Sequence, residues 1–275
     1  MKQSVFRLLI FVSLFSLHTL LTAETGPIRI LFLGHEQKNH RSDLYYPMLE
    51  QALGPDAIYF DYVTDPETAL GNAEYLNRFD ALLIYAFLKE ISPHQWKILK
   101  SYVDEGGGFL PIHCASWCFE NEPGFDQLVG GRFAHHKTGV FSPNTIKPDH
   151  PAVEGVPGFK AWDETYVHIN HNPNNRVVLQ VREVAGSDDN IQKAEPWTWI
   201  RSVGKGKVFY TASGHDERVW NQSAFLELLK AGILWAVGDL SLIHISEPTS
   251  PRLLSYAVFC LKKKRGGGGG GGGGG

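Results

Sequence analysis

The alternation of short apolar runs with helical patterns in the first half of the chain constrains the fold more than any other feature. The apolar runs are typical of buried strands and lie at residues 28–34, 57–63, 80–87 and 109–113. Helical spacing appears at residues 42–53, where Ser42 is a candidate N-cap, and at 93–105, after Ser92. Strands that alternate with helices predict a mainly parallel sheet with helices on both faces.

The second half of the chain has a different pattern, rich in strands. Turn signals separate four further extended segments, at residues 131–143, 163–169, 176–184 and 196–213. An amphipathic pattern at residues 221–238 predicts a closing helix. In parallel sheets, ligands bind beyond the carboxyl ends of the strands, which directs attention to the loops after Gly34, Phe87, His113 and Ala212.

We do not expect either end of the chain to be part of the folded domain. Residues 1–23 have two basic residues, an apolar run and a small residue at Ala23, which is typical of a secretory signal peptide. Residues 240–275 resemble a translated sequencing-library adapter followed by a glycine run, and we interpret them as a non-native, unstructured tail. The predicted domain is residues 24–239, and the predicted location is secreted or periplasmic.

The charge of this domain excludes some partners. Without the two basic residues of the leader, and the five basic and one acidic residues of the tail, the formal charge falls from −3 to −9. An acidic domain is a poor ligand for nucleic acid or for an anionic membrane, so we expect neither as a partner. Only two cysteines remain, too few for a disulfide scaffold.

A thiol mechanism is one hypothesis for the chemistry. Cys114 follows a predicted strand and precedes a predicted helix, whose positive N-terminus would favour a thiolate. His215, with Glu217 two residues on, could supply the base and its orienting carboxylate. In the alternative interpretation, Cys114 is a small buried residue and His215 ends a strand.

A metal site is the second hypothesis. Ligands gathered from separate loops could hold zinc, and the candidates are His113, His135, His136, Glu164 and His215. Asp163 and Glu164 are neighbours on an extended segment, so their side chains point to opposite faces and we favour Glu164. The candidate substrate-binding residues are His35, His40, Trp117 and Trp162.

Several sequence blocks, in order, resemble the ThuA-like family, which is named for a trehalose-utilisation protein. They are GGGFLPIH, LVGGRFAHH, DHPAVEGVPGF, DETY, GKGKVFYTASGH and GILWAVGD, between residues 28 and 238. The resemblance implies a flavodoxin-like fold, similar to class I glutamine amidotransferases, and a role in carbohydrate catabolism, including that of keto-sugar glycosides. Amidotransferases use a Cys and a His-x-Glu, which Cys114, His215 and Glu217 match by motif.

The sequence therefore predicts a carbohydrate-processing protein, with a hydrolase or lyase acting on a small saccharide as the first hypothesis. The alternative is a non-catalytic sugar-binding module that uses the same site. An amidotransferase comes third, because such enzymes work with a synthetase partner and ATP in the cytoplasm, whereas this chain carries a signal-like leader.

Deleting residues 240–275 tests the interpretation of the tail. We expect the melting temperature to change by no more than about a degree, because a segment that was never selected to fold with the domain contributes little to its stability. Thermal denaturation of the full and shortened chains measures this, and a loss of several degrees would contradict the interpretation.

Overall fold

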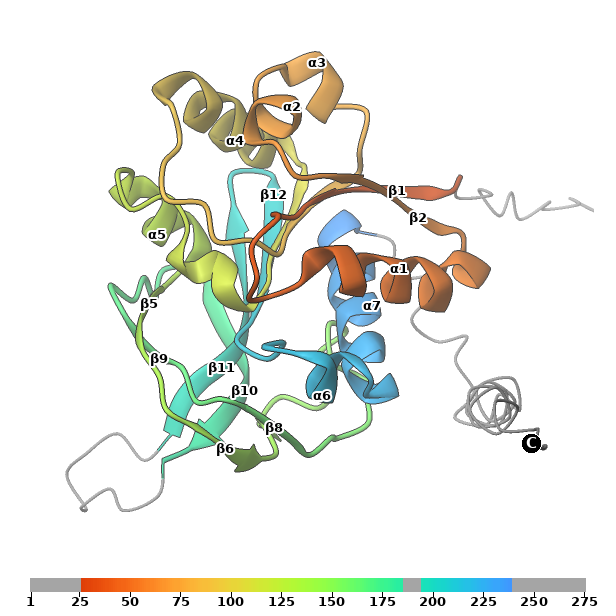
Figure 1. Ribbon diagram of the computed structural model, residues 1–275, viewed down its shortest axis with the longest axis vertical. Coiled ribbons are helices and arrows are strands. Elements are labelled where there is room, and N and C mark those ends of the chain that lie inside the picture. Colours follow the sequence, from red (N-terminus) through yellow and green to blue (C-terminus); the bar gives the residue numbers. More distant parts are fainter. Residues whose placement is uncertain (1–25, 185–193, 239–275) are drawn as a thin grey trace, which may run out of the picture.

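The computed structural model describes residues 26–184 and 194–238, so the predicted leader and tail lie outside the described residues. One large twisted sheet forms the centre of the molecule (Figure 1). Its strands, in spatial order, are β2 (Ile58–Val63), β1 (Ile28–Leu33), β3 (Ala81–Ile84), β4 (Gly108–Pro111), β12 (Gly206–Thr211), β11 (Ala194–Val203), β10 (Arg176–Glu183) and β7 (Asn144–Thr145).

The sheet has a parallel half and an antiparallel half that meet at β12. Strands β2, β1, β3, β4 and β12 run parallel to their neighbours, and β12, β11, β10 and β7 form antiparallel pairs. The carboxyl ends of β4 and β12 lie side by side, since Ile112 bridges to Thr211. The predicted α/β fold, with its strand-rich second half, is confirmed.

Helices cover both faces of the sheet (Figure 1). On one face lie α1 (Ser42–Leu53), α6 (Glu217–Trp220) and α7 (Ser223–Val237); on the other lie α2 (Pro66–Leu70), α3 (Ala73–Leu76), α4 (Pro93–Glu105) and α5 (Pro123–Val129). Strand β1 serves both cores because its side chains alternate. Ile30 and Phe32 pack toward α1 and α7, whereas Leu31 and Leu33 pack toward the opposite helices.

Two short 3-10 helices, η1 (Gly54–Asp56) and η2 (His113–Trp117), complete the helical elements in the described ranges. Helix α4 begins as predicted: Ser92 is its N-cap, and Gln95 closes a capping box. The predicted N-cap of α1 is wrong, because Arg41 holds that position and Ser42 is the first helical residue. The Ser42 hydroxyl instead accepts from the His35 amide and donates to the His35 carbonyl, both at 2.9 Å, and so fixes the loop after β1.

Two antiparallel ribbons lie beside the main sheet: β5 (Arg132–His135) with β9 (Val167–Ile169), and β6 (Thr138–Phe141) with β8 (Ala161–Glu164). Both lie below the parallel half in Figure 1. Thr138 pairs with Glu164 at the end of the second ribbon, and this register fixes the backbone position of Glu164.

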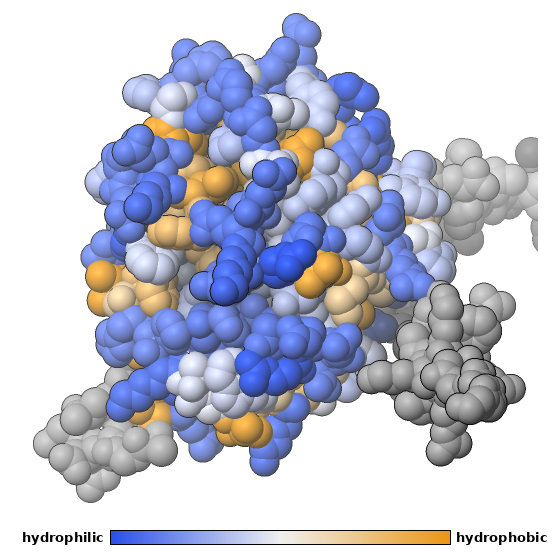
Figure 2. Space-filling view, viewed as in Figure 1, coloured by the Kyte–Doolittle hydropathy of each residue, from blue (hydrophilic) through white to orange (hydrophobic). Residues whose placement is uncertain are grey.

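The visible surface is mainly hydrophilic. Hydrophobic residues are scattered over the face in Figure 2 and form no continuous patch among its described residues, so this face lacks the usual mark of a large docking surface. Within the two described ranges, no helix is both long and apolar enough to cross a membrane.

A single methyl group at Gly206 tests the junction between the two halves of the sheet. A Cβ there would lie 2.2 Å from the Val103 carbonyl oxygen and 2.7 Å from that of Gly107, and these are backbone atoms that cannot turn away. We expect Gly206→Ala to lower the free energy of unfolding by about 1–3 kcal/mol. Gly158→Ala is the control, because nothing lies within 4 Å of its added Cβ. Urea denaturation measures both, and equal stabilities would contradict this account of the junction.

Candidate functional site

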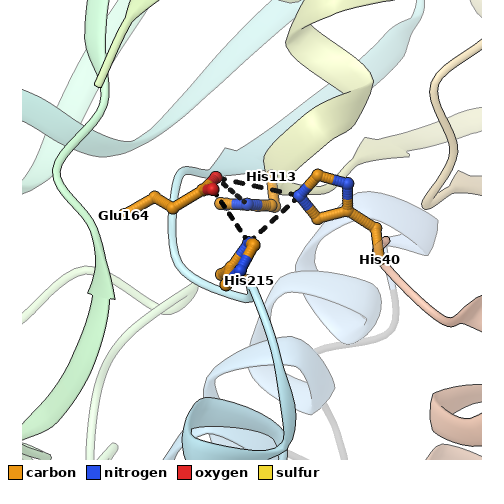
Figure 3. A group of neighbouring side chains, drawn as sticks. All are labelled: His40, His113, Glu164 and His215. Carbon is orange, nitrogen blue, oxygen red and sulfur yellow. Dashed lines mark hydrogen bonds and ion pairs between the residues drawn. The ribbon is translucent and has the colours of Figure 1, made fainter. Parts of the chain in front are cut away.

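Four side chains from distant parts of the sequence converge beyond the carboxyl ends of the parallel strands (Figure 3). His40 lies in the loop after β1, His113 follows β4, and His215 follows β12. Glu164 ends β8 and enters from the smaller ribbon. One ligand-type atom from each residue lies within 4.8 Å of all the others. We call these four residues the His–Glu cluster.

Glu164 is at the centre of the cluster, and each of its oxygens faces imidazole nitrogens. Oε2 lies 3.2 Å from His113 Nε2 and 3.7 Å from His40 Nε2. Oε1 lies 3.1 Å from His215 Nδ1, which is itself 3.2 Å from His40 Nε2. Burial alone would raise the pKa of Glu164, but the surrounding imidazoles outweigh it and hold that pKa well below its ordinary value, so the carboxylate is ionised.

His113 is held rigidly in a constrained backbone conformation. Its φ of 50° lies in the left-handed region that residues other than glycine rarely adopt. Its ring is fully buried, stacks on Tyr166 at a centroid distance of 4.3 Å, and places Nδ1 2.6 Å from the Ala212 carbonyl oxygen. Since a carbonyl only accepts hydrogen bonds, Nδ1 carries the proton. Burial lowers the pKa of His113 to about 4, so the ring is neutral and Nε2 presents a lone pair.

Asp163 fixes the position of the loop that carries His215. Its carboxylate accepts the backbone N–H of Gly214 at 3.1 Å and that of His215 at 3.2 Å. Burial raises the pKa of Asp163 to about 7, although these backbone donors act in the opposite direction. The adjacent residues of β8 therefore have different roles. Glu164 faces the imidazoles, and Asp163 binds the backbone amides of Gly214 and His215. The preference for Glu164 agrees with this geometry, but the part played by Asp163 was missed.

His215 is a member of the cluster whose pKa is raised above its ordinary value. Burial alone would lower its pKa, but the contact with Glu164 and the nearby charges of Asp216 and Asp163 outweigh burial and raise it above the ordinary value. Its side chain is partly exposed, as is that of His40. The cluster therefore has a buried side at His113 and a side that solvent reaches.

His35 and His40 have separate roles. His35 is buried, its Nδ1 accepts from the Phe87 amide at 3.2 Å, and its Nε2 donates to the His40 carbonyl at 2.8 Å. Both ring nitrogens of His35 therefore hold the loop, and the structure does not bring this residue, predicted to bind substrate, into the His–Glu cluster. His40, expected to bind substrate, instead belongs to the His–Glu cluster.

His135 and His136, at the end of β5, also have different surroundings. His136 Nε2 lies 3.4 Å from Glu164 Oε1, next to the cluster, with its side chain 36% exposed. His135 ends β5, is exposed, and is absent from the group of converging ligand atoms found among the described residues. The structure therefore does not bring His135, a predicted metal candidate, into the His–Glu cluster.

Two tryptophans lie in the aromatic surroundings of the cluster. Trp162 lies beside His215 at a centroid distance of 5.8 Å, with the Arg218 guanidinium 3.5 Å from the centre of the Trp162 ring. Trp117 is 38% exposed and packs on Phe133, which in turn contacts His136. Of the two tryptophans predicted to bind substrate, Trp162 contacts the cluster directly, and Trp117 is linked to it through Phe133 and His136.

The environment of Cys114 disfavours a thiol nucleophile. Cys114 is only 1% exposed and lies in η2, a 3-10 helix of five residues, rather than at the N-terminus of an α-helix. Burial raises its pKa well above the ordinary value, which opposes thiolate formation. Glu217 is also misplaced for an orienting role: it is exposed at the start of α6 and lies against Tyr45, whereas the carboxylates at His215 are Glu164 and Asp163.

Comparisons with known proteins place the chain among relatives of the same fold. A family model described as ThuA, trehalose utilisation, matches residues 29–236. A ThuA-like protein from Bacteroides uniformis superposes with a TM-score of 0.64 at 17% identity, over 78% of this chain and 93% of that one. A second, from Parabacteroides merdae, gives 0.63 at 20% identity, over 77% and 90%.

A β-galactosidase from Bacillus circulans matches with a TM-score of 0.51 at 16% identity, over 77% of this chain but 31% of the galactosidase. No curated protein matches the sequence. At these identities the solved structures show a shared fold and not a shared reaction.

The burial of Cys114 predicts slow alkylation. In the native protein we expect iodoacetamide to modify Cys114 at least about 100-fold more slowly than in denaturant, because the sulfur becomes accessible only when the chain opens locally. Peptide-resolved mass spectrometry measures Cys114 separately from the other cysteines. Rapid modification of Cys114 in the native protein would contradict this prediction and support the thiol hypothesis.

Proposed function

Because the chain belongs to the ThuA family, described as trehalose utilisation, we propose that it is a carbohydrate-processing enzyme that acts on a small saccharide at the His–Glu cluster. A keto-sugar glycoside is included in this substrate class, and the reaction type is hydrolysis or elimination. The observation that carries the proposal is the convergence of four ionisable side chains at the carboxyl edge of the parallel strands.

The chemistry of the cluster suits a polyhydroxylated substrate. The ionised Glu164 and the imidazole nitrogens offer acceptors for sugar hydroxyls, and the partly exposed sides of His40 and His215 give access to them. His136 lies beside Glu164 and is exposed, so its ring is available to a sugar hydroxyl.

The flanking tryptophans support a sugar ring as the ligand. Apolar C–H faces of saccharides pack on indole rings, and an indole that is partly exposed has surface available for this contact. Trp162 is pre-positioned by Arg218, whose guanidinium lies over its ring, and Trp117 is supported by Phe87 and Phe133. A small saccharide packed on Trp162 would lie beside His215 of the cluster.

The proposed location is outside the cytoplasm. The basic, apolar and small-residue order of residues 1–23 supports export, and the acidic domain that follows it suits free diffusion to a small neutral ligand. A non-catalytic sugar-binding module would use the same cluster and the same tryptophans, so turnover is what separates the two functions.

Glu164→Gln tests the proposed catalysis. The protein is incubated with trehalose, related disaccharides and their 3-keto forms, and products are followed by chromatography. We expect turnover of at least one substrate and a loss of about 10²–10⁴-fold in kcat/KM for the variant, because the neutral amide cannot replace the central carboxylate.

Glu217→Gln is the matched control, since Glu217 is exposed at the start of α6 and should leave turnover unchanged. Saturable binding by the wild type across this panel, without any product, would reject the enzyme and favour the binding module.

A further inference from the structure

We propose that His40, His113, Glu164 and His215 are the protein ligands of one divalent transition-metal ion, with zinc as the ion that fits them best. This inference deepens the proposed function, because it names the group at the site that would contact the saccharide. It rests on the proposed function only for that last step, since metal binding is measured without any substrate.

The first argument is electrostatic and concerns His113 Nε2. This nitrogen is buried, has no hydrogen-bond partner among the described residues, and lies 3.2 Å from Glu164 Oε2. The only proton on the ring nitrogens of neutral His113 is on Nδ1, which donates it to the Ala212 carbonyl. Two electron-rich atoms therefore face each other in a desolvated place, which costs free energy unless a cation lies between them.

A proton alone does not resolve this arrangement. A proton shared by His215 Nδ1 satisfies Glu164 Oε1, at 3.1 Å, but leaves His113 Nε2 and Glu164 Oε2 opposed. A second proton on His113 would place a charged ring in a position that is fully buried. One cation at the centre of the cluster engages all of these atoms at once.

The second argument is geometric. In a tetrahedral zinc site with bonds of ~2.1 Å, neighbouring ligand atoms lie about 3.4 Å apart. Four separations in the cluster bracket this value: 3.1 Å for His215 to Glu164 Oε1, 3.2 Å for His113 to Glu164 Oε2, 3.2 Å for His40 to His215, and 3.7 Å for His40 to Glu164 Oε2. One ligand atom from each of the four residues lies within 4.8 Å of the others. Figure 3 shows the four side chains pointing toward one another.

The third argument is the chemistry of the donors and of their supports. Three imidazoles and one carboxylate suit zinc and its first-row neighbours, whereas magnesium and calcium prefer oxygen ligands. Metal-binding histidines usually donate their second N–H to a carbonyl or carboxylate, which fixes the ring. His113 does so through Ala212, and Asp163 fixes the backbone of His215.

The location of the ion would explain the flanking residues. Its buried side is closed by His113 and Tyr166, whereas His136, which is exposed, and Trp162 lie next to Glu164 and His215. Zinc can take a fifth ligand during catalysis, and a carbonyl or hydroxyl oxygen of a saccharide is a suitable one. The ion would polarise that oxygen while the sugar ring packs on an indole.

Metal titration of the full chain tests the proposal directly. The protein is freed of metal with a chelator and titrated with zinc by calorimetry, and with cobalt by its visible absorption, which reports a tetrahedral nitrogen–oxygen site. We expect one tight equivalent and a strong cobalt band. His40→Ala and His215→Ala should each weaken zinc binding about 100-fold or more, since each removes a ligand from a partly exposed position where folding tolerates the change.

His135→Ala is the matched control, because His135 lies beside His136 but outside the cluster, and its binding should equal that of the wild type. Circular dichroism of each variant separates lost binding from lost folding. Absence of a tight equivalent in the wild type, or equal affinity in a folded His40→Ala or His215→Ala protein, would overturn the metal site.

The experiments distinguish failure of the metal site from failure of the proposed enzyme. Turnover that resists chelator in a protein without zinc affinity would reject the metal and keep the enzyme. Tight, ligand-dependent zinc binding without turnover of any saccharide would keep the metal and reject the enzyme.

Discussion

The parallel pairing of β4 with β12 is the constraint on which the rest of the structure depends. It joins the alternating first half of the chain to the antiparallel second half, and it places residues 113 and 215 at neighbouring strand ends although about a hundred residues separate them. The hydrogen bond from His113 to the Ala212 carbonyl continues this pairing beyond the strands. The same contact fixes the tautomer of His113, so the architecture of the sheet sets the chemistry of the ring.

Much of the fold could be predicted because hydrophobic periodicity is a local signal. The parallel sheet, the capped helix at residues 93–105 and the strand-rich second half all follow from spacing that is visible in the sequence. The order of strands does not: β12 inserts beside β4 by long-range pairing, and no local pattern encodes its neighbour. The error at Ser42 has a similar cause, since its hydroxyl satisfies a distant loop instead of its own helix.

The site was predictable in part for the same reason. His113 and His215 follow predicted strands, so topology alone brought them to one edge, and a carboxylate from the second half was expected there. Choosing among neighbours requires side-chain direction. His40 and His136 reach Glu164, whereas His35 serves the loop and His135 faces solvent. Asp163 could have been recognised only from the backbone donors of the Gly214 loop, which the sequence does not display.

The His–Glu cluster draws its members from residues 40, 113, 164 and 215, which come from three strand ends and a separate ribbon. No segment of the chain holds more than one of them, so the complete cluster requires the assembled sheet. In particular, His215 reaches the other three only when β12 lies beside β4. Any ligand that needs all four side chains would therefore stabilise the pairing of the two halves of the sheet.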